Sequence, residues 1–292
     1  MKMSQKIRGI AALLLCTIIW GFAFIAQSVG MDNLGPMSFQ ALRAGLAVAF
    51  LVPFSFVLDR TVSLAQWGDK RLWRSGFLCG IALFVASGLQ QIALVDTDAG
   101  KAGFLTAMYI VIVPLLGLLR GRKMPKTTLP SVALAVAGLY LLSCAGPGGM
   151  RRGDLLLIAS AFAFAVQITL VDRLSPGLDG FRMNAIQSLT VCVLSLPWML
   201  VEKPTLAAIV ACRVPLLFAG VLSMGVAYSL QIVGQKRVPP TAASLIMSLE
   251  SAFAALGGWW LLDERMTPPE LAGCCLMFAA VILSQLPQKK KE

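Results

Sequence analysis

Long apolar stretches, separated by short polar segments, divide the chain from near its start to near its end. Each stretch contains about 20 mostly apolar residues, the length that a helix needs to cross the hydrocarbon core of a bilayer. The first is expected to remain in the protein, because it is too long for a signal peptide and no small-residue cleavage site follows it before Asp32. The pattern predicts an all-α integral membrane protein with ten transmembrane helices, at residues 9–29, 37–58, 75–94, 102–120, 128–145, 154–171, 183–201, 214–234, 241–262 and 269–286.

The composition argues against an ordinary soluble domain. Apolar residues make up 58% of the 292 residues and charged residues only 13%, whereas soluble domains have about 45–50% and about 25%. A soluble globule of this size could not bury so many apolar side chains.

The net charge of +11 reflects how the 25 Lys and Arg residues are distributed. With the N-terminus placed in the cytoplasm, most of them fall in the predicted cytoplasmic segments. This asymmetry obeys the positive-inside rule and predicts a multi-pass protein with both termini in the cytoplasm. The basic charge then orients the protein and contacts anionic lipid, so we expect the bilayer as a partner and no nucleic acid.

Similar features recur at a nearly constant spacing. Gly9 and Gly153 each open an apolar stretch, and residues 97–124 align without gaps with residues 239–266. Their order along the chain indicates a duplication, with one repeat at residues 1–146 and the other at residues 147–292. Five spans in each repeat make the second repeat enter the membrane upside down. Inverted repeats of this kind are common in secondary transporters, whose substrate site lies near the midplane between the repeats.

Several short motifs resemble one known family. They are Trp20-Gly21 and Arg43 in the first two spans, Ala-Gly-Lys-Ala-Gly-Phe-Leu-Thr at 99–106 followed by Val-Pro-Leu-Leu at 113–116, and Pro-Thr-Ala-Ala-Ser-Leu at 240–245 followed by Leu-Asp-Glu-Arg at 262–265. With these motifs the chain resembles the EamA branch of the drug/metabolite transporter superfamily, from about residue 9 to residue 286.

The resemblance implies ten helices in two inverted five-helix repeats, and transport of small organic solutes across the bacterial inner membrane. It does not imply one substrate, since relatives handle amino acids, other metabolites and toxic organic compounds. Many relatives carry a proline near position 251, where this chain has Ser251 preceded by Glu250. This departure argues against the helix distortion that the proline usually gives.

Ionisable side chains within a span are functional candidates because burying them in lipid is costly. Glu250 falls near the middle of the ninth span, where it could bind a substrate ammonium or carry a proton, or simply tie helices together. Arg43 falls about two turns inside the outer end of the second span. It either snorkels to the outer surface or forms a fixed charge at the outer mouth, facing a substrate carboxylate or Glu250.

Neutral polar and aromatic side chains within the spans could complete a binding site for a small, partly apolar ligand. The same residue types also serve ordinary packing and the membrane interface. Trp20 is favoured because the resemblance supports it as well. The candidate substrate-binding residues are Glu250, Trp20, Tyr109, Gln91, Gln167, Tyr228 and Gln231.

Other classes of function fit the sequence less well. The chain has no histidine, so neither a Ser–His pair nor an HExxH metal site can form, and we expect no metal, no cofactor and no enzyme. A membrane sensor or scaffold with a transporter-like fold stays open, as does a passive channel. We therefore predict a secondary transporter of a small organic metabolite, an amino acid or related amine first, in the bacterial plasma membrane. It would work by alternating access, as a monomer or a homodimer.

Overall fold

A computed structural model describes residues 3–58, 66–97, 99–121, 124–143, 152–261 and 267–285. The 262–265 motif lies outside these ranges, as do some of the Lys and Arg residues counted for the positive-inside rule, among them Arg60, Arg122, Lys123 and Arg151. The helices are α1 (Met3–Gly30), α2 (Pro36–Leu58), α4 (Lys70–Ala93), α5 (Ala99–Ala107), α6 (Tyr109–Leu119), α7 (Thr128–Ser143), α8 (Arg152–Leu174), α9 (Gly180–Glu202), α10 (Leu206–Ala211), α11 (Arg213–Leu217), the π-helix η1 (Phe218–Ala227), α12 (Tyr228–Gln235), α13 (Pro240–Met247), α14 (Glu250–Leu261) and α15 (Pro268–Gln285).

The described residues form an all-helical membrane fold. Helical segments occur at all ten predicted stretches, and eight of them are long and apolar enough to cross a membrane. The apolar helices at the fifth and tenth stretches, Thr128–Leu141 and Leu271–Ser284, are shorter. Large apolar side chains such as Trp198 and Trp260 stay exposed on the outside of the bundle, as expected where lipid replaces water.

Two spans are interrupted near their middle. The first consists of α5 and α6, which meet at Met108, and the second of α13 and α14, which meet at Ser248 and Leu249. The second break occurs although Ser251 replaces the usual proline, so our expectation of an undistorted helix there is wrong. Instead, the Ser251 hydroxyl donates a hydrogen bond to the carbonyl of Gly103 across the bundle (2.8 Å).

A third span, Arg213–Gln235, contains the π-helix η1. A π-helix leaves backbone carbonyls displaced from their α-helical partners. Asn184 on α9 satisfies two of them, because its side-chain amide donates to Met224 O (2.8 Å) and Gly225 O (2.9 Å). This contact joins η1 firmly to α9.

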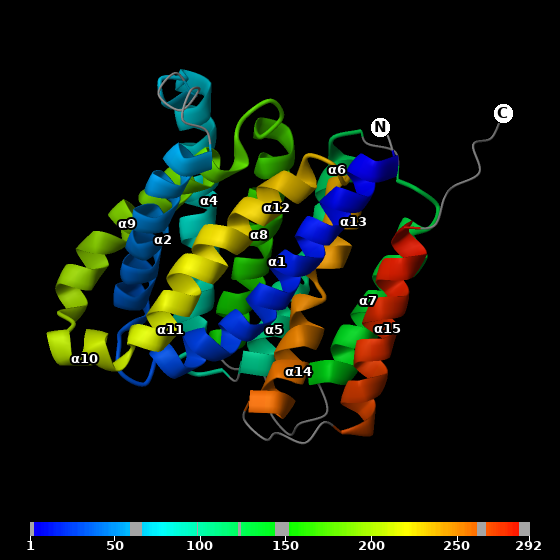
Figure 1. The fold of residues 1–292 in the computed structure, drawn as a ribbon. Helices are drawn as coiled ribbons and strands as arrows, with labels where there is room; N and C mark the ends of the chain where they lie inside the picture. The colour runs from blue at the N-terminus through cyan, green and yellow to red at the C-terminus, as the bar shows by residue number, and fades with distance from the viewer. Residues whose placement is uncertain are drawn as a thin grey trace.

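The helices pack in a regular arrangement, which Figure 1 shows. Helix α2 lies against α9 at one edge of the bundle, and α7 lies against α15 at the other. Between these pairs, α1 packs on α12 and α14, while α8 packs on α4 and α5. The main apolar core runs between these central helices and surrounds a polar region at the middle of the molecule.

Candidate functional site

A narrow cavity lies among the central helices, with a volume of about 30 Å³ for the centre of a water-sized sphere. That is room for one or two water molecules. Its wall comes from α1, α2, α4, α5, α6, α8, η1, α12 and α14, so residues far apart in the sequence meet there. The lining residues are Trp20, Ala23, Phe24, Gln27, Arg43, Gln90, Thr106, Tyr109, Phe164, Ile168, Ser223, Tyr228, Gln231 and Glu250.

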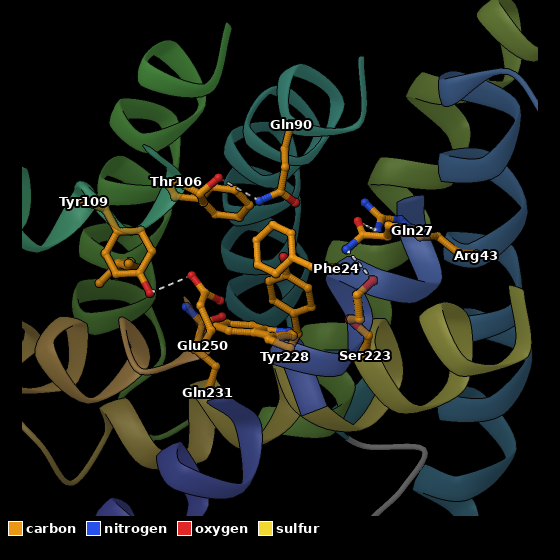
Figure 2. Close-up of a pocket in the computed structure, with 14 residues that line it drawn as sticks. Phe24, Gln27, Arg43, Gln90, Thr106, Tyr109, Ser223, Tyr228, Gln231 and Glu250 are labelled. Carbon is orange, nitrogen blue, oxygen red and sulfur yellow. Dashed lines mark hydrogen bonds between the residues drawn. The ribbon is translucent and has the colours of Figure 1, made fainter. Parts of the chain in front are cut away.

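Glu250 and Tyr109 form a hydrogen-bonded pair in this wall (Figure 2). The Tyr109 hydroxyl donates to Glu250 Oε1 at 3.0 Å. Each residue is the first of the half-helix that follows a break, Tyr109 in α6 and Glu250 in α14. The Glu250 side chain is only 5% exposed, and no ion pair neutralises it among the described residues. Its carboxylate therefore keeps the capacity to accept hydrogen bonds from a ligand.

Arg43 also lies in the cavity wall, with only 5% of its surface exposed. It therefore does not snorkel to the outer surface, and that interpretation is wrong. We predicted a charge at the outer mouth, whereas the side chain stands beside Gln27 inside the cavity. Its Nη1 donates to Gln27 Oε1, and its guanidinium lies 5.9 Å from the centre of the Phe39 ring. The alternative pairing with Glu250 is not formed.

Aromatic rings cover the middle of the cavity. Trp20 and Tyr228 have ring centres 4.7 Å apart at an angle of 58°. Phe24 and Phe164 add further apolar wall. The buried indole N–H of Trp20 has no hydrogen-bond partner among the residues that the structure describes. An unsatisfied buried donor is costly, so a ligand acceptor or a water molecule fits this position.

The predicted glutamines divide into two groups. Gln231 lines the cavity, and Gln167 lies behind it, donating to Gln231 Oε1 and accepting from Gln231 Nε2 (3.0 Å). Gln91 points elsewhere and donates to the sulfur of Met31 (3.1 Å). Its neighbour Gln90 lines the cavity instead, held by a hydrogen bond to the Thr106 hydroxyl (3.1 Å).

Besides Gln90, three polar lining residues were not predicted from the sequence, namely Gln27, Thr106 and Ser223. Gln27 had a usable signal, because it lies seven residues after Trp20 and so two turns further along the same helix face. Ser223 had none, since its direction depends on the π-helix. Among the described residues, no group of three or more His, Cys, Asp or Glu side chains is placed to hold a metal ion.

The end of the bundle that carries the start of α1 is closed by tight contacts. A Cβ on Gly9 would lie 3.2 Å from the carbonyl oxygen of Gly234, so α1 and α12 touch there through their backbones. Beside them, the Lys236 ammonium donates to the carbonyl of Leu178, and burial lowers the pKa of Lys236. In the same loop as Leu178, the carbonyl of Pro176 accepts a hydrogen bond from Arg71 Nη2 (2.9 Å).

The many apolar spans define a multi-pass membrane protein with a polar, aromatic cavity between its interrupted helices. The EamA-like transporter family matches residues 7–144 and again residues 151–286. The chain belongs to this family and is a membrane transporter.

Similar proteins agree with this assignment. An uncharacterized transporter of Archaeoglobus fulgidus is 30% identical over 275 residues, which cover 94% of this chain and 84% of that protein. The threonine/homoserine exporter RhtA of Salmonella typhimurium is 30% identical over 165 residues, 55% of each chain. The uncharacterized inner membrane transporter YicL of the same species is 23% identical and covers 99% of both chains. One solved structure, described as "Crystal structure of protein", shares the fold with a TM-score of 0.75 at 19% identity, over 98% of this chain and 97% of that chain.

Proposed function

We propose that this transporter is a secondary carrier with ten transmembrane helices in two inverted five-helix repeats, at residues 1–146 and 147–292. It moves a small organic metabolite, an amino acid or related amine first, across the bacterial plasma membrane by alternating access. The substrate binds in the central cavity, near the midplane, between the repeats. The observation that carries the proposal is the Tyr109–Glu250 pair on two interrupted helices.

Several features support the inverted repeat. Tyr109 and Glu250 are 141 residues apart, follow equivalent helix breaks and bond to each other, as residues beside a pseudo-two-fold axis would. The glycine contacts match as well. A Cβ on Gly9 would lie 3.2 Å from Gly234 O, and a Cβ on Gly153 would lie 3.2 Å from Ala93 O. Gly9 and Gly153 are 144 residues apart and Ala93 and Gly234 are 141 apart, close to the repeat spacing.

The packing supports alternating access. Helices α1, α12 and α14 form one group, and α8, α4 and α6 form the matching group with the repeats exchanged. The cavity lies between these two groups, so a rocking motion of one against the other would open it to one side and then to the other. Interrupted helices that line a midplane site are a recurring feature of such carriers.

The cavity chemistry supports an amino acid or an amine. The Glu250 carboxylate can accept hydrogen bonds from an ammonium group, and such charge-assisted bonds are about twice as strong as neutral ones. The rings of Trp20 and Tyr228 offer π-faces to a cation. The exporter RhtA, similar over about half of the chain, is named for two amino acids.

The proposed orientation has both termini in the cytoplasm. The start of α1 and the end of α15 lie at the same end of the bundle in Figure 1, as an even number of crossings requires. The positive-inside rule then assigns that end to the cytoplasm. The location in the bacterial plasma membrane agrees with the relative YicL, which is named an inner membrane transporter.

The test is counterflow in proteoliposomes that contain the purified protein. Liposomes loaded with one unlabelled amino acid or amine are diluted into the labelled compound, and its transient accumulation is recorded. Glu250→Gln should reduce counterflow at least about tenfold, because it removes a charge-assisted hydrogen bond worth about 1.5–3 kcal/mol. Glu202→Gln is the matched control, since its carboxylate lies outside the cavity and binds Met37 N and Ser38 N.

Three alternatives give different results. A sensor or scaffold would bind a ligand without counterflow. An enzyme would change the compound rather than accumulate it. A passive channel would equilibrate the label without the transient overshoot that a loaded carrier produces. Counterflow that is unchanged by Glu250→Gln would keep the carrier but remove Glu250 from the binding site.

A further inference from the structure

Arg43 is a buried cation that makes no ion pair with any residue the structure describes. Its side chain is 95% buried, and its hydrogen-bond partner is the neutral amide of Gln27. Its Nε has no hydrogen-bond partner within the described part of the chain. A charge within a membrane span is costly unless something pairs with it. Among the described residues, no carboxylate does so.

Glu250 is the acidic residue of the same cavity wall, and it lies away from Arg43. Figure 2 shows Arg43 and Gln27 on one side and Glu250 and Tyr109 on the other, with Phe24 and Tyr228 between them. The packing of α1 agrees with this separation. Gln27 and Trp20 are seven residues apart, a rise of about 10 Å along α1. Gly21, next to Trp20, contacts Phe253, one turn beyond Glu250.

We propose that Arg43 and Gln27 form a subsite for a carboxylate, so that the substrate carries a carboxylate at this end and a separate ammonium group at Glu250. The proposal rests on the transport function above and specifies its substrate class. It selects linear amino acids with a terminal ammonium group, of which lysine is the simplest common example. The Gln27 amide oxygen is also suitably placed to accept from an α-ammonium group beside that carboxylate.

Because Arg43 and Glu250 lie at separate ends of the cavity, a ligand with fewer charged groups cannot contact both of them. An amino acid with only its α-ammonium group has both charged groups attached to the same carbon, so it can reach one end of the cavity at a time. A diamine has no anion for Arg43. The rings of Trp20 and Tyr228 between the ends suit a chain of methylene groups.

A carboxylate fits this subsite better than a phosphate. The guanidinium of Arg43 presents a planar fork that binds either group. However, one guanidinium balances the single charge of a carboxylate, whereas a phosphate ester would bring excess negative charge into a buried site that already contains Glu250. The structure therefore favours an organic acid over a nucleotide or a sugar phosphate.

A matched set of ligands tests this assignment. Lysine carries all three charged groups, ε-aminocaproate lacks the α-ammonium, cadaverine lacks the carboxylate, and norleucine lacks the terminal ammonium. Dissociation constants are measured on the purified protein by calorimetry. We expect lysine and ε-aminocaproate to bind about tenfold to a hundredfold more tightly than cadaverine and norleucine, the factor of one charge-assisted hydrogen bond.

Variants assign each end of the ligand to its side chain. Arg43→Gln should weaken the binding of lysine until its dissociation constant equals that of cadaverine. The dissociation constant of cadaverine should not change. Arg43→Lys should restore part of the lysine affinity, because it keeps the charge and loses the fork. Glu250→Gln should weaken the binding of lysine and ε-aminocaproate but not the binding of norleucine. Arg182→Gln removes another buried arginine, bound to Gln66 and Ser55 outside the cavity, and should leave the ligand order unchanged.

Cadaverine that binds as tightly as lysine would overturn the carboxylate subsite, and this comparison needs only the wild-type protein. If a folded Arg43→Gln variant lost affinity for lysine and for cadaverine by the same factor, this would overturn the carboxylate subsite as well. Binding by none of the four ligands would also overturn it. In that case counterflow with other solutes decides the transport function separately, since a carrier for a different compound would still show it.

Discussion

Replacement of Gly21 by alanine tests the closest helix contact beside the cavity. A Cβ on Gly21 would lie 2.5 Å from Phe253 Cβ, 2.8 Å from Phe253 C and 2.9 Å from Ala254 N, whereas ordinary contacts begin at 3.4 Å. Two of these atoms belong to the backbone of α14, so they cannot rotate away. Helices α1 and α14 must therefore separate, which shifts Trp20 and Glu250 on the two sides of the contact.

The change in the free energy of unfolding caused by Gly21→Ala follows from two opposing effects. Overpacking of this kind costs about 1–3 kcal/mol, and the better helix propensity of alanine returns up to about 1 kcal/mol. Gly117→Ala is the matched control, because Gly117 also lies within a helix and a Cβ there meets nothing within 4 Å. The difference between the two variants isolates the steric cost, which should be about 1–3 kcal/mol.

The assay is thermal unfolding of both variants in the same detergent, together with the affinity for lysine. Gly21→Ala should melt several degrees below Gly117→Ala, at roughly 2–4 °C per kcal/mol. It should also bind lysine more weakly, because Trp20 and Glu250 move apart. Equal melting temperatures would refute the close contact of α1 and α14.

Three further predictions concern other parts of the bundle. Asn184→Ala should destabilise the protein by about 1–3 kcal/mol, measured by denaturant unfolding, because Met224 O and the Ser229 hydroxyl lose their side-chain donor, while Gly225 O keeps the hydrogen bond from Ser229 Oγ. A loss below about 0.5 kcal/mol would contradict this. Glu202→Gln should lower the free energy of unfolding by about 0.5–2 kcal/mol in the same assay, since the carboxylate of Glu202 caps the start of α2. An unchanged free energy of unfolding would show that this cap is unimportant. Gln90→Leu should weaken ligand binding, measured by calorimetry, and Gln91→Leu should not, because Gln90 lines the cavity and Gln91 points to Met31. The opposite result would mean that Gln91, not Gln90, faces the ligand.

The fold could be predicted largely from the sequence because bilayer thickness sets the length of each apolar stretch. Every predicted stretch contains helix in the structure. The breaks within the fourth and ninth spans could not be predicted from apolar length, since the two half-helices of each span lie in one continuous apolar stretch. The break at Ser248 and Leu249 shows that a proline near position 251 is not required for it.

The site could be predicted in part. Glu250 and Arg43 stood out because charges are rare inside spans, and both line the cavity. Trp20, Tyr109, Tyr228 and Gln231 were also selected and line it. The choice of Gln91 over Gln90 failed because adjacent residues on a helix point about 100° apart, and small uncertainty in the rotation of α4 decides between them. The direction of Arg43 depended on Gln27 and Phe39, whose positions follow from tertiary packing.

The central claim is that the cavity is a transport site reached from both sides of the membrane. The most direct measurement is labelling of Ser223→Cys, in a variant without the seven native cysteines, by a membrane-impermeant thiol reagent added to either side of sealed vesicles. The account predicts labelling from each side and protection by a bound ligand such as lysine. Labelling from one side only, or at a rate that no transported ligand changes, would contradict it.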